Sequence, residues 1–135
     1  MKSIKLIVIV VFLFIFSSAS FAGGKIYYFF SFSMPEESLV QAMRQAKQLN
    51  ATMVLRGLKN DNWNATLKEI LTLSQKAGVQ KGAIIDPTLF DDFDVRVVPA
   101  VVYQCEDGNY CKVSGNIPIQ NALEVIFRRG DSCRD

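Results

Sequence analysis

Three cysteines, Cys105, Cys111 and Cys133, are the most reactive side chains in this 135-residue sequence, which contains no histidine. Disulfide exchange needs a thiolate and a second thiol close by. Cys105 and Cys111 lie on either side of a hairpin signal, and a three-residue loop at Asp107–Asn109 would set them opposite each other. We therefore expect a structural Cys105–Cys111 disulfide. Pairs with Cys133 and free thiols remain alternatives, and Cys133 could instead crosslink a dimer or a partner.

The absence of histidine limits the other chemistry that the chain could perform. Ser33 would lack the usual general base of a hydrolytic nucleophile. It begins the spacing Ser33-Met34-Pro35-Glu36, which is typical of a helix-capping box. The remaining cysteines and carboxylates are dispersed, so we predict no metal site, no cofactor and no catalytic residue in a hydrolytic role.

The N-terminus has the order of a secretory signal peptide. Lys2 and Lys5 precede the apolar run Leu6–Phe16, and Ser20-Phe21-Ala22 offers small residues to signal peptidase. The run is too short to cross a bilayer, which needs about 20 residues. We predict cleavage after Ala22, export to the periplasm, and one domain at 23–135 with a short charged tail. An uncleaved anchor is the alternative.

Removing the signal peptide changes the charge of the protein. The precursor has 15 basic and 13 acidic residues, and the loss of Lys2 and Lys5 leaves the two signs balanced. Without a positive field, binding to nucleic acid has little to drive it. We expect neither a nucleic-acid partner nor a stable membrane span after cleavage.

The hydrophobic pattern predicts an α/β fold. Strands are expected at 25–32, 52–55, 83–85, 97–103 and 110–113. Helices are expected from the Ser33 cap to about Asn50, at 63–77, as one turn at 90–93, and from an Asn116 cap to Gly130. The order βαβα, short β, then ββα favours a mixed sheet with a central parallel part and a C-terminal hairpin, flanked by helices in three layers.

This order resembles the thioredoxin fold. Ser33-Met34-Pro35-Glu36 stands at the strand-to-helix junction where thioredoxins carry Cys-x-Pro-Cys, and it keeps the proline without either cysteine. The segment from Asp94 to Pro99 resembles the one that leads into the cis-proline of that superfamily. The resemblance implies the fold, and the missing thiols imply that this junction performs no thiol redox chemistry.

Three co-linear motifs give a narrower resemblance, to the TrbC family of F-type conjugative pilus assembly proteins. They are Phe30–Leu39, Val54–Leu58, and Asp86–Phe90 followed by Val98–Val102. The resemblance implies a non-enzymatic periplasmic component of a type IV secretion system that contacts other assembly proteins, above all a TraW-like protein. The alternative is a periplasmic thiol isomerase or redox chaperone that uses the three cysteines.

The motifs also predict a binding surface, because parallel strands end at one edge of a sheet and ligands favour that edge. Arginine is favoured in interface anchors, although Arg56 could instead pair with Asp86 or Glu37 and only tie loops together. The predicted partner-binding residues are Ser33, Met34, Pro35, Glu36, Glu37, Arg56, Gly57, Asp86, Pro87, Val98 and Pro99.

Overall fold

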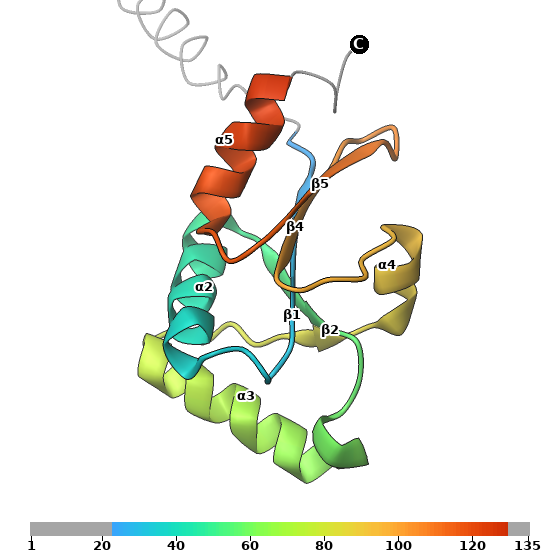
Figure 1. Ribbon diagram of the computed structural model, residues 1–135. Helices are drawn as coiled ribbons and strands as arrows, with labels where there is room; N and C mark the ends of the chain where they lie inside the picture. Colours follow the sequence, from blue (N-terminus) through green and yellow to red (C-terminus); the bar gives the residue numbers. More distant parts are fainter. Residues whose placement is uncertain (1–22, 130–135) are drawn as a thin grey trace, which may run out of the picture.

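The computed structural model describes residues 23–129. The predicted signal peptide at 1–22, the helix stop at Gly130 and Cys133 lie outside these residues. Five strands form one mixed sheet in the order β3-β2-β1-β4-β5 (Figure 1). They are β1 (Lys25–Phe30), β2 (Thr52–Leu55), β3 (Ile84–Ile85), β4 (Ala100–Gln104) and β5 (Tyr110–Ser114). The helices are α2 (Glu36–Leu49), α3 (Trp63–Ala77), α4 (Pro87–Asp92) and α5 (Ile119–Arg129), with a short 3₁₀ turn, η1 (Lys59–Asp61).

The sheet has the predicted mixed topology. β1 pairs in parallel with β2, and β2 in parallel with β3, whereas β4 runs antiparallel to both β1 and β5. The central position of β1 explains why its sequence is apolar without alternation, since both of its faces are covered. The predicted α/β class, strand order and hairpin are confirmed.

Alternate residues of β1 build two cores on the two faces of the sheet. Tyr28 and Phe30 point into the larger core, to which α2, α3 and α5 contribute. Phe29 points into the smaller core and meets Phe90 of α4 edge to face, with 4.8 Å between ring centroids. Figure 1 shows the resulting layers, with α4 alone on its side of the sheet.

Helix α3 is where the predicted apolar stripe is only half right. The spacing predicts a buried stripe of Trp63, Leu67, Ile70, Leu71, Ser74 and Ala77. Ile70, Ser74 and Ala77 are buried, and Thr66 and Leu73 complete the buried face. Trp63, Leu67 and Leu71 are instead exposed by 59, 55 and 59%. Both series fit a helical period around Ile70, so periodicity alone does not say which side the sheet covers.

The hairpin between β4 and β5 turns one residue earlier than predicted. The N–H of Cys105 donates to the carbonyl of Asn109 at 2.7 Å. The loop is therefore Glu106–Gly108 rather than Asp107–Asn109. Gly108 has a φ of +91°, and a three-residue hairpin loop needs such a left-handed residue at its end, which glycine adopts without strain.

This shift in register separates the two hairpin cysteines. Cys111 pairs with Tyr103, and Cys105 lies two residues further along β4. Diagonal neighbours on a sheet lie roughly 7 Å apart, whereas the β-carbons of a disulfide lie roughly 4 Å apart. Cys111 is a free thiol, so the predicted Cys105–Cys111 disulfide is wrong. The alternative pairs with Cys133 lie outside the described residues.

The start of α5 also differs from the prediction. Asn116 does not cap the helix; the side chain of Gln45 on α2 accepts a hydrogen bond from the N–H of Ile119 at 2.7 Å. A residue 74 positions away cannot be found by a search for local capping patterns. The spacing predicts a buried face of Ile119, Ala122, Leu123, Ile126 and Phe127. The first four are buried, but Phe127 is 56% exposed and packs edge to face against the ring of Tyr103.

Candidate functional site

The loops that carry the predicted site residues follow strands that end together. Phe30 pairs with Leu55, and Leu55 pairs with Ile85, so β1, β2 and β3 end in line. The N–H of Asp86 continues this ladder, donating to the carbonyl of Leu55 at 2.9 Å. β4 begins beside them, since Ala100 pairs with Phe29. We call the surface formed by the loops at 33–37, 56–57, 86–87 and 98–99 the motif edge.

The junction between β1 and α2 is not closed by the predicted capping box. The residue before the helix is Pro35, and no side chain caps the first turn. The hydroxyl of Ser33 instead lies 2.9 Å from that of Ser31, and the N–H of Ser33 donates to the same Ser31 oxygen. Glu36 makes an ion pair with Lys76 of α3 rather than turning back on Ser33.

The junction between β3 and α4 is closed by a side chain. Asp86 accepts hydrogen bonds from the N–H groups of Thr88 and Leu89, at 2.9 and 3.2 Å. Pro87 occupies the first turn, where a missing N–H costs little. Asp86 is thus engaged in holding its own helix.

Arg56 lies on the surface between these junctions. Its guanidinium is 3.6 Å from the carboxylate of Asp91 on α4, with side chains that are 64 and 75% exposed, and it lies 5.7 Å from the ring centroid of Phe90. The alternative that Arg56 pairs with Asp86 or Glu37 is therefore wrong, and its carboxylate partner is Asp91. Exposed pairs of this kind contribute about 1 kcal/mol or less, so Arg56 adds little to the fold.

The segment that leads into β4 is held by hydrogen bonds to its backbone carbonyls. The ammonium group of Lys112 donates to the carbonyls of Phe93 and Asp94. Arg96 donates to the Asp94 carboxylate at 2.8 Å and, by that hydrogen bond and its charge, lowers the pKa of Asp94. The Val98-Pro99 peptide bond is cis, an isomer that the sequence left open.

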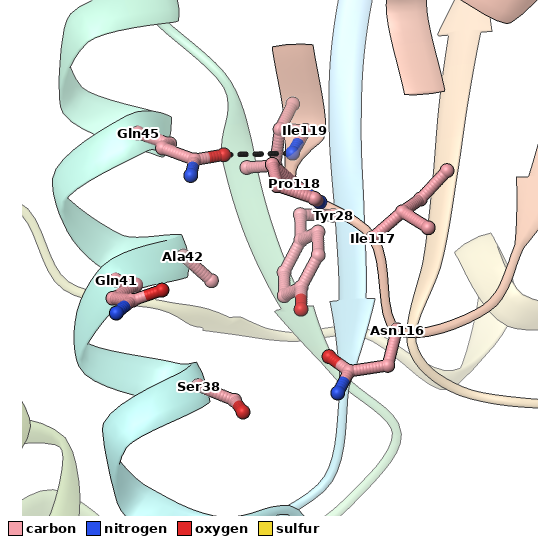
Figure 2. A pocket seen from close by; sticks show the side chains of 9 residues that line it. All are labelled: Tyr28, Ser38, Gln41, Ala42, Gln45, Asn116, Ile117, Pro118 and Ile119. Atoms are coloured by element: carbon pink, nitrogen blue, oxygen red, sulfur yellow. Dashed lines mark hydrogen bonds between the residues drawn. The ribbon is translucent and has the colours of Figure 1, made fainter. Parts of the chain in front are cut away.

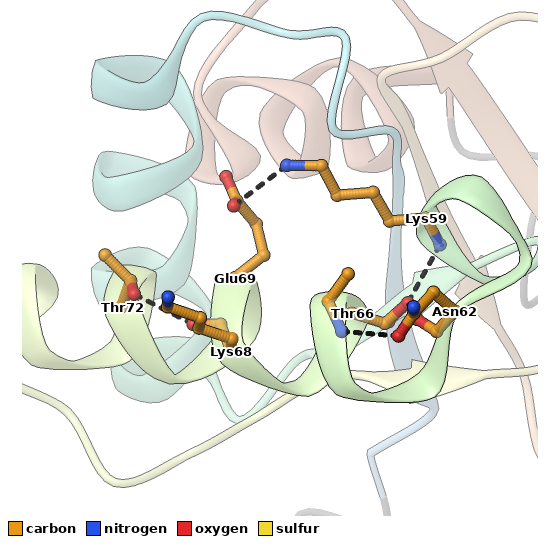
Figure 3. A network of polar contacts seen from close by, with 7 residues as sticks. Lys59, Asn62, Thr66, Lys68, Glu69 and Thr72 are labelled. Atoms are coloured by element: carbon orange, nitrogen blue, oxygen red, sulfur yellow. Dashed lines mark hydrogen bonds and ion pairs between the residues drawn. The ribbon is translucent and has the colours of Figure 1, made fainter.

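A polar network holds the loop between β2 and α3, next to Gly57 (Figure 3). The N–H of Lys59 donates to the hydroxyl of Thr66, whose own proton goes to the carbonyl of Asn62. The Lys59 ammonium reaches Glu69 at 3.0 Å and lies 5.8 Å from the ring centroid of Phe32. This network links the Arg56 loop to the segment that carries Ser33.

Behind the motif edge is a polar pocket of about 180 Å³, which sequence reasoning missed. Its side chains come from β1, from α2 and from the segment before α5 (Figure 2). Tyr28 lines it from the sheet. Tyr28 is part of an aromatic strand, and nothing in that pattern indicates that one hydroxyl opens into a cavity.

Residues 23–129 offer neither a cluster of metal ligands nor a membrane-spanning helix. Within this range no three metal-ligating side chains gather at one point. None of the helices described is both long enough and apolar enough to span a bilayer.

The architecture is shared with solved structures of the thioredoxin-like class. StoA from Bacillus subtilis superposes with a TM-score of 0.53 at 14% identity, covering 76% of this chain and 81% of that one. DsbF from MTB, described in mixed oxidized and reduced forms, gives 0.51 at 18% identity, covering 79% and 81%. At these identities the likeness shows the fold alone: this chain has a thioredoxin-like fold, with Ser33 and Glu36 where the β1 strand leads into α2.

The sequence then defines the family. Residues 28–126 match the TrbC type-F conjugative transfer system pilin assembly proteins, and the chain belongs to that family. The periplasmic protein TrbC of Escherichia coli K12 is 39% identical over 107 residues, which are 79% of this chain and 49% of the relative. The chain therefore spans about half the length of this curated relative.

Proposed function

We propose that this protein is a periplasmic scaffold of an F-type conjugative type IV secretion system, which acts in pilus assembly by protein contact at the motif edge. The observation that carries the proposal is that the three sequence motifs of the family meet at that edge, where residues 23–129 place no thiol. Membership of a pilin assembly family and the relative's description as periplasmic support the setting.

A non-enzymatic role follows from what occupies the junction. Ser33 and Glu36 stand where a thioredoxin has its two thiols, and neither an alcohol nor a carboxylate forms a mixed disulfide. The free thiol of Cys111 lies on β5, half-buried and opposite Tyr103. It is therefore remote from the helix start that lowers a catalytic thiol's pKa.

An insulin-reduction assay separates this proposal from the alternative of a thiol isomerase. We expect no turnover above buffer from the exported protein. Activity that disappears in a variant with all three cysteines replaced by serine would overturn the non-enzymatic role.

The proposed partner is a TraW-like assembly protein, as the family resemblance implies. The side of the molecule that would receive it offers Arg56, on the loop after β2, and two exposed glutamates in the first turn of α2, Glu36 and Glu37. An arginine in a weak, exposed ion pair keeps most of its capacity for a partner carboxylate, because its present pair holds it by about 1 kcal/mol or less.

Affinity capture from a conjugating donor strain tests the proposal. The tagged wild-type protein should retain pilus assembly proteins, and Arg56→Glu should lose them while melting at the wild-type temperature. Arg128→Glu is a matched control: Arg128 is also exposed and also forms a single weak ion pair, with Glu124 at 3.7 Å, but it lies at the far end of α5. Equal capture by both variants would refute the surface assignment.

A further inference from the structure

The polar pocket has the composition of a recognition site rather than of a packing defect. It lies between α2 and the segment before α5, and its floor is β1 (Figure 2). None of the residues that line it is charged, and most carry a hydroxyl or an amide. The lining consists of Tyr28, Ser38, Gln41, Ala42, Gln45, Asn116, Ile117, Pro118 and Ile119.

Tyr28 is the residue that points to a ligand. The residue as a whole is only 3% exposed, and within residues 23–129 its hydroxyl makes no hydrogen bond to protein. No side-chain nitrogen or oxygen in this range is both buried from solvent and without a partner. The hydroxyl must therefore open into the pocket. Figure 2 shows the ring directed toward the end of the pocket where Ser38 and Asn116 lie. This hydroxyl, on an otherwise buried side chain, can therefore form a hydrogen bond with whatever occupies the pocket, a water or a ligand.

Burial also keeps this hydroxyl a donor. It raises the pKa of Tyr28 from 10.0 to about 12, so the phenol stays protonated throughout the physiological range. The pocket therefore always presents one O–H that can both donate and accept.

The other polar groups narrow the chemistry of the occupant. Within the described chain, Ser38, Gln41 and Asn116 make no side-chain hydrogen bond to protein, and Gln45 uses its oxygen on Ile119. Together they offer donors and acceptors without charge. A charged group would lose its hydration without a counter-ion, and an apolar group would leave these atoms unpaired. A carboxamide, with two N–H donors and one carbonyl, matches both needs.

The pocket is continuous with the motif edge. Ser38 lies in the first turn of α2, directly after Glu36 and Glu37. Asn116 follows Gly115, whose N–H donates to the carbonyl of Pro99 at 2.9 Å. We propose that this pocket receives an uncharged carboxamide side chain, asparagine or glutamine, from the polypeptide that docks at the motif edge. This inference rests on the proposed function, since it assigns one contact within that surface.

Small probes test the pocket without any partner. The exported protein, labelled with ¹⁵N, is titrated with acetamide, with isosteric acetate and with acetone, which lacks the N–H donors. Acetamide should shift the amide signals of Ser38 and Asn116 saturably, at least tenfold more tightly than the other two, and Tyr28→Phe should abolish the difference. Equal shifts from all three, or none, would show that the pocket holds only water and would overturn the proposal.

Partner capture then tests the pocket's role in docking. Because one hydrogen bond is worth about 1 kcal/mol, Tyr28→Phe should weaken capture roughly fivefold, at an unchanged melting temperature. Asn116→Leu, which keeps the size but removes the amide, should act in the same direction. Undiminished capture by both variants, or a lowered melting temperature in Tyr28→Phe, would refute the pocket. If Arg56→Glu loses partner capture in the same series while the pocket variants do not, the pocket is refuted but the proposed function is not.

Discussion

Two strand-to-helix junctions lie on the motif edge, on either side of the end of β2, and both place a proline at the start of a helix. At the β3–α4 junction, Asp86 accepts two backbone hydrogen bonds and closes the helix start. At the β1–α2 junction, no side chain caps the helix, and Ser33 turns toward Ser31 instead. The first N–H groups of α2 are therefore left to solvent or to a partner.

The presence or absence of a side-chain cap distinguishes the β3–α4 junction, which we call closed, from the β1–α2 junction, which we call open and which leaves backbone N–H groups available to a partner. The closed junction carries Phe90, which anchors α4 to the sheet, and its sequence is explained by stability. At the open junction, the motif Phe30–Leu39 contributes Phe30 and Leu39 to the core, but Ser33 between them caps nothing. A loop residue that no capping role explains is more informative about function than one that holds a helix in place.

Phe90→Ala should have the largest effect, because it removes the anchor of the closed junction. Phe90 is 4% exposed and its ring meets Phe29, so the loss should be about 3 to 5 kcal/mol of the free energy of unfolding. Urea denaturation measures it. Leu67→Ala, at a residue that is 55% exposed, should cost much less; equal losses would contradict the packing described here.

The second effect concerns Tyr28, behind the open junction. An unfolded tyrosine loses its proton near pH 10, but burial raises the folded pKa of Tyr28 to about 12. Between these values the unfolded state binds fewer protons, so stability falls as the pH rises, by about 2 to 3 kcal/mol. Denaturation curves from pH 9 to 12 should show a steeper fall in wild type than in Tyr28→Phe. Parallel curves would place Tyr28 in water.

Asp86→Ala should come third. It removes the cap of α4, which typically costs about 1 kcal/mol, and thermal unfolding should register the change. Asp86→Asn keeps a capping oxygen and should restore most of the loss. If the alanine variant is as stable as wild type, the two junctions do not differ as described.

Ser33→Ala should have the smallest effect. Ser33 caps nothing, so the free energy of unfolding should change by less than about 0.5 kcal/mol. Chemical denaturation beside Asp86→Ala provides the comparison. If Ser33→Ala loses as much free energy of unfolding as Asp86→Ala, Ser33 does cap α2, and the two junctions do not differ.

Much of the fold could be predicted from local sequence. The apolar run at 25–32 indicated the central strand, and Gly78, with a φ of +68°, ends α3 where the pattern placed its stop. Parallel strand ends then predicted that the motif loops meet. These features depend on spacing along a short stretch of chain.

The predictions that were wrong depended on residues far apart in the sequence or on a shift of one residue in the hairpin loop. Gln45, rather than a local side chain, caps the start of α5. The hairpin loop turned one residue early, which moved Cys111 away from Cys105. The polar pocket joins Tyr28, Ser38 and Asn116 from three separate elements, and no local pattern indicates that they meet.

Photo-crosslinking in a conjugating donor tests the central claim most directly. A photoreactive residue placed at Met34, on the open junction, should crosslink to a pilus assembly protein. The same residue at Leu67, exposed on the outer side of α3, should give far less of that product. Crosslinks from Leu67 alone, with none from Met34, would contradict the assignment of the motif edge as the docking surface.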